Sequence, residues 1–129
     1  MKQITRDMIK IYNLKDYDFM GYKLIKSQAT YHHLIKREHN GKETISNGSI
    51  LMPVAHNYLH IIEYKEYEIF DAINKIMKIC NKKGAVEVSD LKIINELLKM
   101  FEEEHKQDKT SKGKILIKHQ YLDRIYYDN

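Results

Sequence analysis

The sequence lacks the features that disulfide-bonded, zinc-ribbon and membrane proteins require. Cys80 is the only cysteine, which excludes an internal disulfide and the cysteine pairs of a zinc ribbon. No apolar run approaches the roughly 18 residues that a membrane-spanning helix takes. Residues 1–6 lack the apolar stretch of a secretory signal peptide. These absences predict a cytoplasmic protein with no membrane partner.

The charge of the chain is moderately positive, with 22 Lys and Arg against 18 Asp and Glu and a net charge of +4 at pH 7. Such a balance permits nucleic-acid binding without establishing it. A length of 129 residues with 43% hydrophobic residues suits one domain with one core, spanning 1–129. We therefore expect a single domain with DNA among its possible partners.

The N-terminal third of the chain divides into a helical part and a strand-like part. Residues 1–20 have helical periodicity, and Thr5 is a plausible N-cap. Residues 29–51 are rich in β-branched and polar residues and contain Gly41 and the Asn47-Gly48 pair. That segment predicts a β-hairpin with an irregular connection. Asn47-Gly48 alone is also typical of a tight hairpin turn, which is compatible with a functional role for Asn47.

The rest of the chain is predominantly helical in pattern. A short helix should hold residues 56–60, and a longer amphipathic helix should follow and end at Lys82-Lys83-Gly84. A third helix should begin at Ser89 or Asp90. Residues 105–113 predict a mobile basic loop and 114–118 a short strand. The inward positions of the helices should be Ile62, Ile69, Phe70, Ile73, Met77, Cys80, Ile94, Leu97, Leu98 and Phe101.

The histidines are concentrated in one window, because five of the seven lie between positions 32 and 60. His56 and His60 are four residues apart, so on a helix they share a face and can point at one ion. His32 and His33 are adjacent, so on a strand they point to opposite sides. One of this adjacent pair can then bind metal while the other faces a substrate.

These residues resemble the HNH family of endonucleases, which is also called the ββα-metal family. The resemblance rests on Tyr31-His32-His33, on Asn47 before an apolar strand, and on His56-x3-His60. It covers about 35 of the 129 residues. It implies an α+β fold in which a ββα-metal motif, residues 30–62, packs with a helical extension at 63–106 and a basic loop and short segment at 107–129.

The resemblance also implies roles for individual residues. His33 corresponds to the general base that takes a proton from the attacking water. His32 and His60 correspond to metal ligands, with His56 as a third. Asn47 corresponds to the residue that fixes the loop after His33 by bonding its backbone. The cofactor implied is one divalent ion (Mg, Mn, Zn or Ni), and the activity implied is metal-dependent hydrolysis of DNA phosphodiester bonds.

The chain also departs from the family pattern. Many members carry a cysteine pair for a structural zinc, but Met52 and Ala55 stand where one such pair would fall. We therefore expect no structural zinc. The proline that often follows the His-His strand is missing, and Lys36 lies in that region.

Several alternatives remain open at this stage. Lys36 and Arg37 can grip phosphates, or they can be ordinary solvated charges, and the same choice applies to the basic run 106–118. A catalytically inactive protein with this fold, like small single-domain relatives on phage or mobile elements, would bind nucleic acid or regulate a protein partner. A third alternative is a metal site that only holds a small fold together. A water-accessible His33 and an open coordination position favour the enzyme.

Overall fold

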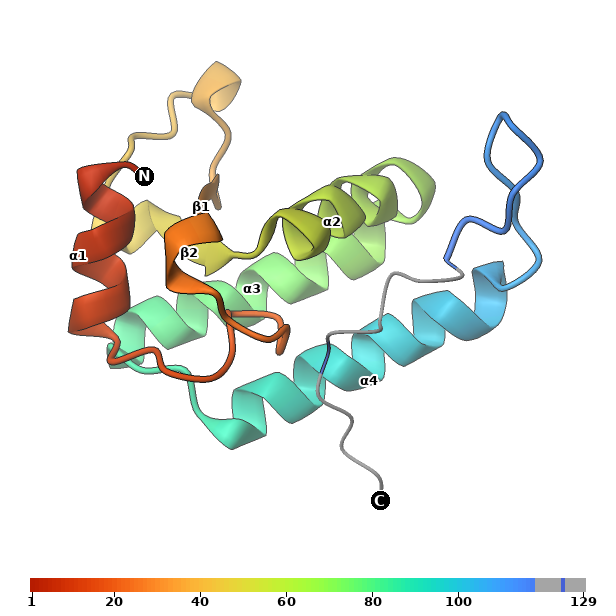
Figure 1. Ribbon diagram of the computed structural model, residues 1–129. Helices are drawn as coiled ribbons and strands as arrows, with labels where there is room; N and C mark the ends of the chain where they lie inside the picture. Colours follow the sequence, from red (N-terminus) through yellow and green to blue (C-terminus); the bar gives the residue numbers. More distant parts are fainter. Residues whose placement is uncertain (118–123, 125–129) are drawn as a thin grey trace.

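The computed structural model describes residues 1–117 and 124 and has an α+β architecture (Figure 1). Helices α1 and α2 both pack against a two-stranded hairpin, α3 packs against α2, and α4 packs against α3. No helix in the described part of the chain is long and apolar enough to cross a membrane. The elements are α1 (Gln3–Ile11), β1 (Thr30–His33), β2 (Gly48–Leu51), α2 (Pro53–Lys65), α3 (Tyr67–Lys83) and α4 (Val88–His105), with short 3-10 turns η1 (Lys26–Gln28), η2 (Arg37–His39) and η3 (Ile45–Asn47).

The expected hairpin is present, with β1 and β2 antiparallel and His33 opposite Gly48. Its connection spans residues 34–47 and includes η2 and η3. Asn47-Gly48 is not a tight turn, because Asn47 ends η3 and Gly48 begins β2 with a φ of −121°. Gly48 is needed for another reason: a Cβ there would clash with the ring of Tyr31.

The first helix is shorter than the predicted 1–20. It ends at Ile11, and Asn13 then adopts a left-handed φ of 51°, which stops the helix. Thr5 is not the N-cap but a buried residue inside the helix, which begins after Lys2.

The long helices keep their predicted inward faces but differ in their ends. The predicted inward residues are buried, except that Leu97 is only partly so. Ile62 belongs to α2, because the chain breaks at Glu66 (φ −146°, ψ 80°) before α3 begins. Gly84 ends α3 in the left-handed region, as predicted. Helix α4 is capped by Glu87 and not by Ser89 or Asp90; Asp90 completes the capping box by bonding back to Glu87.

The segment after α4 contains less regular structure than the sequence suggests. The helix runs through His105, and residues 114–117 form no strand: Ile115 makes only an isolated bridge with Lys109. Lys118, the last residue of the expected strand, lies outside the described residues.

A buried aspartate fixes the start of α2. The Asp18 side chain is fully buried and accepts hydrogen bonds from the backbone N–H groups of Met20 (2.8 Å), Tyr22 (2.9 Å) and Met52 (2.8 Å). Burial raises the pKa of Asp18 to about 7, and the backbone donors oppose that rise. Met52 is the residue from which α2 begins, so this carboxyl ties the loop after α1 to the helix that carries His56.

Candidate metal centre

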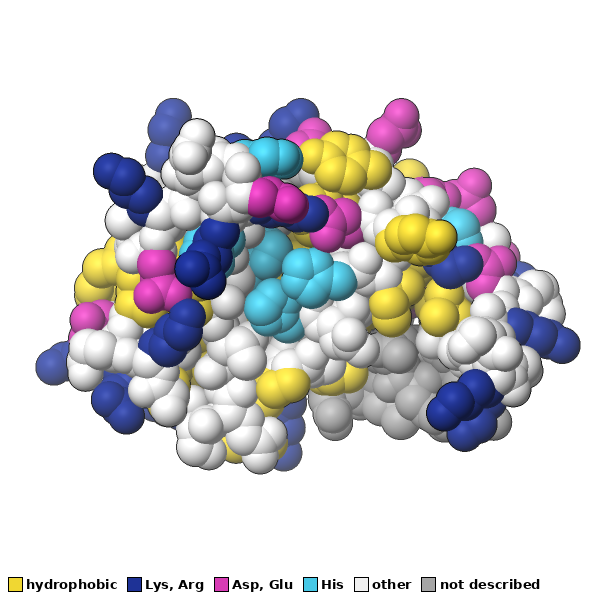
Figure 2. Space-filling model, turned by 90° about the horizontal axis from the view of Figure 1, so that it is seen from above, with side chains coloured by type: hydrophobic (Ala, Val, Ile, Leu, Met, Phe, Trp, Pro, Cys, Tyr) yellow, Lys and Arg dark blue, Asp and Glu magenta, His cyan; other side chains and the backbone are white. Residues whose placement is uncertain are grey.

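Three histidines from the hairpin and α2 converge on one point. The potential ligand nitrogens of His32, His56 and His60 all lie within 4.8 Å of one another. His32 is buried, His56 half-buried and His60 exposed. They line an open cavity of about 390 Å³, and Figure 2 shows histidine side chains gathered in a hollow with charged side chains around it. The three imidazoles can therefore offer one nitrogen each to an ion in a cavity that is open to solvent.

His32 and His56 are each oriented by one hydrogen bond. His32 Nε2 donates to Oδ1 of the buried Asn74 at 3.0 Å. His56 Nδ1 donates to Thr30 Oγ1 at 2.9 Å, because that hydroxyl already gives its proton to the carbonyl of Leu51 at 2.7 Å. The opposite nitrogens, His32 Nδ1 and His56 Nε2, have no hydrogen-bond partner among the described residues. Such outer contacts fix the tautomer of a metal-binding histidine.

His60 follows the same pattern with a carboxylate. Its Nδ1 lies 3.2 Å from Glu63 Oε1, one helical turn along α2, which leaves Nε2 on the other side of the ring. Glu63 also forms an ion pair with Lys36, and Lys36 approaches Glu38 at 3.6 Å. The positive charge of Lys36 is therefore paired with glutamates, whereas Arg37 is exposed at the edge of the cavity.

Electrostatics keep the two inner histidines in the form that a metal requires. Burial, with a smaller contribution from the neighbouring imidazoles, lowers the pKa of both His32 and His56 to about 4. Both rings are therefore neutral at pH 7. A neutral imidazole is the form that ligates an ion, so no proton has to be removed from these rings first.

His33 lines the same cavity but takes no part in the cluster. Its ring packs edge-on against Tyr31, with the centroids 4.8 Å apart, and is only partly buried. Neither ring nitrogen has a hydrogen-bond partner among the described residues. Burial lowers the pKa of His33 as well, so its ring can accept a proton.

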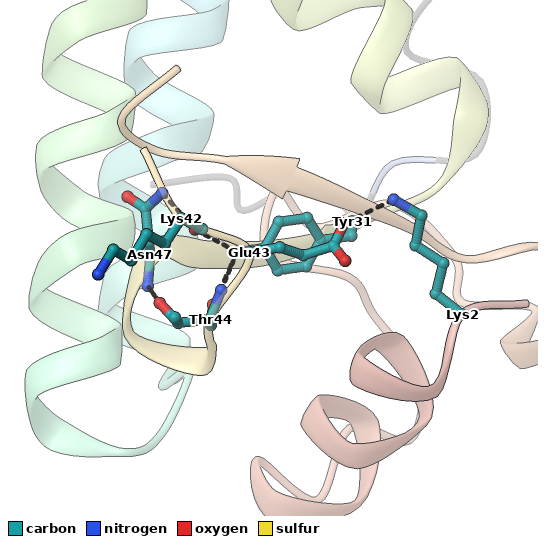
Figure 3. Close-up of polar contacts among 6 residues, drawn as sticks. All are labelled: Lys2, Tyr31, Lys42, Glu43, Thr44 and Asn47. Carbon is teal, nitrogen blue, oxygen red and sulfur yellow. Dashed lines mark hydrogen bonds and ion pairs between the residues drawn. The ribbon is translucent and has the colours of Figure 1, made fainter. Parts of the chain in front are cut away.

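Asn47 secures the chain that leaves His33. Its Oδ1 accepts from the N–H of Ile35 (2.8 Å), and its Nδ2 donates to the carbonyls of Ile35 (3.0 Å) and Lys42 (2.9 Å). Figure 3 shows Asn47 beside Lys42 and Thr44, in the loop that Tyr31 also contacts. The side chain bonds backbone only, so its geometry suits holding the loop and not touching a substrate.

The residues that orient the three rings are not predicted by the sequence motif. Thr30 lies two residues before His32 and Glu63 three residues after His60, so both are close enough in the chain to give a local signal. Asn74 is 42 residues from His32 and gives no local signal. The role of Asn74 follows only from the packing of α3 beside the hairpin, which brings it to His32.

Comparisons with protein-family models, with curated proteins and with solved structures find no match for this chain. The chemistry of the site is therefore inferred from its donors. Three converging imidazoles suit a divalent transition metal, and an adjacent unbonded imidazole suits proton transfer.

Proposed function

We propose that this protein is an HNH-type endonuclease that hydrolyses DNA phosphodiester bonds with one divalent ion. The observation that carries the proposal is that His32 and His33, neighbours on β1, lie in different surroundings within one cavity. His32 faces His56 and His60, while His33 stays outside that cluster in the same cavity. The order β1, β2, α2, with Asn47 directly before β2, also supports a ββα-metal motif.

Each residue has a separate task in this proposal. His32, His56 and His60 hold the ion, which supplies positive charge to the scissile phosphate and the leaving 3′ oxygen. His33 takes a proton from the attacking water at one of its unbonded ring nitrogens. Asn47 positions the chain that follows His33, through Ile35 and Lys42. The exposed side of the cavity lets the phosphate and the water reach the ion.

The donor set also bears on which ion is bound. Three imidazoles favour zinc, nickel or cobalt in affinity, with manganese weaker. Magnesium prefers oxygen ligands and would be held weakly. The ion with the highest affinity and the ion that gives the fastest turnover can therefore differ.

The first test compares wild type with His60→Ala. Wild type should nick supercoiled plasmid with manganese or magnesium, and the variant should lose both nicking and one equivalent of bound ion in calorimetry. His60 is exposed, so its removal should leave the fold intact. Equal ion binding by both proteins would remove His60 from the site. A wild type that cuts under no divalent ion would favour a non-catalytic binding protein.

The second test concerns the DNA backbone. If Arg37 contacts one phosphate, Arg37→Ala should lower the slope of log affinity against log salt by about 0.9 on duplex DNA. Arg6→Ala is the matched control, because Arg6 is exposed on α1 and does not line the cavity. Fluorescence anisotropy with labelled duplex gives both slopes. Equal slopes for the two variants would exclude Arg37 from the interface.

A further inference from the structure

A second cluster of ligand-type side chains lies where α4 ends. Glu66 is the single residue between α2 and α3, and Glu104 and His105 stand in the last turn of α4. Their potential ligand atoms all lie within 4.8 Å of one another. None of the three belongs to the cavity of His32. The cluster is therefore independent of the proposed nuclease site.

The imidazole of His105 is held in a fixed orientation. Its Nδ1 bonds Asp108 Oδ2 at 2.7 Å, and its ring stacks on Phe101 with the centroids 4.4 Å apart. Asp108 is held in turn by Lys65 Nζ at 2.9 Å. These contacts leave Nε2 directed at Glu66 Oε1, 2.9 Å away. A carboxylate on Nδ1 is the outer contact that metal-binding histidines usually have, and here it leaves Nε2 as the ring nitrogen that faces Glu66.

The two glutamates supply negative charge at the same point. The carboxyl groups of Glu66 and Glu104 lie together, within the 4.8 Å spread of the cluster. The carbonyl ends of α2 and α4 also meet here, and helix C-termini favour cations. The N-terminus of α3 opposes them. On balance two carboxylates and two helix C-termini at one point attract a cation.

We propose that Glu66, Glu104 and His105 form a second divalent-cation site, suited to Zn²⁺, with Asp108 orienting the imidazole. Zinc bonds to nitrogen and oxygen are about 2.0–2.2 Å, so two ligands of one tetrahedral ion lie about 3.4 Å apart, within the 4.8 Å spread of these ligand atoms. The ion takes the place of the Nε2 proton of His105, which passes to solvent. Water fills the fourth position. The bound ion ties the α2–α3 junction to the end of α4.

Calorimetry with Zn²⁺ alone tests this site separately from the first. Wild type should bind two equivalents of zinc, and His60→Ala and Glu104→Gln should each bind one. A variant with both substitutions should bind none. Glu104 is exposed, so its replacement should preserve the fold, which melting curves without zinc verify. Glu103→Gln is the matched control, because Glu103 is exposed beside it and, within the described part of the chain, pairs with Lys106 alone. That variant should keep two equivalents.

Asp108→Asn adds a second measurement. It should weaken zinc at this site by about 10- to 100-fold, because the imidazole loses its orienting carboxylate. The proposal is overturned if Glu104→Gln binds as much zinc as wild type, or if Glu103→Gln loses as much as Glu104→Gln. The two sites are read separately. Zinc that is lost in His60→Ala reports on the proposed nuclease site, and zinc that is lost in Glu104→Gln reports on the second site.

Discussion

Replacing His33 with alanine is expected to lower the rate of plasmid nicking by about 10²- to 10⁴-fold, the usual effect of removing a general base. Metal affinity and thermal stability should stay at the wild-type level. The reason is geometric: the ring of His33 is only partly buried, lies outside the histidine cluster and makes no hydrogen bond to a described residue. The measurement is single-turnover cleavage with manganese, beside calorimetry and melting curves.

Two further variants make that result specific. His39→Ala is the matched control, because His39 is an exposed histidine on η2 that does not line the cavity, and its variant should cut as fast as wild type. His32→Ala should lose metal and activity together, because it removes a proposed ligand whose buried ring is oriented by Asn74. A His33→Ala protein that cuts at the wild-type rate would show that His33 is not the base.

The pairing of His56 with His60 and the separation of His32 from His33 could be predicted because both depend on local periodicity, whereas the choice of His32 as their partner was implied only by the family resemblance. The four-residue step from His56 to His60 places both rings on one face of any helix, whatever packs around it. The adjacent pair on β1 separates because strand side chains alternate. The family resemblance placed Asn47 before an apolar strand, where it lies, but the tight turn that Asn47-Gly48 also suggests is absent because the connection is held by other contacts, such as that of Tyr31 with Thr44.

What the sequence could not supply are the interactions between distant segments. No glycine or proline marks the break at Glu66, so the sequence pattern alone does not predict where α2 ends and α3 begins. Asn74 resembles any polar residue on an amphipathic helix until α3 packs beside β1. Asp18 follows Asp16 in what reads as a polar stretch, yet only one of the two is buried.

That buried carboxyl carries the last prediction, which concerns stability. Asp18→Asn is expected to lower the free energy of unfolding by about 2–4 kcal/mol. The Asp18 oxygens accept from Met20 and Tyr22 on one side and from Met52 on the other. An amide has one oxygen, so its NH₂ group must face at least one backbone N–H, which is then buried without an acceptor.

The measurement is urea denaturation at pH 5, below the Asp18 pKa of about 7, where the wild-type carboxyl is neutral in the fold and the comparison with asparagine does not include the cost of a buried charge. Asp16→Asn is the matched control, because Asp16 is exposed, and its effect should stay within about 0.5 kcal/mol. If Asp18→Asn costs no more than this control, the three bonds do not secure the fold. If the cost is as expected, a carboxyl in the loop after α1 secures the start of α2, because Asp18 accepts from the N–H of Met52.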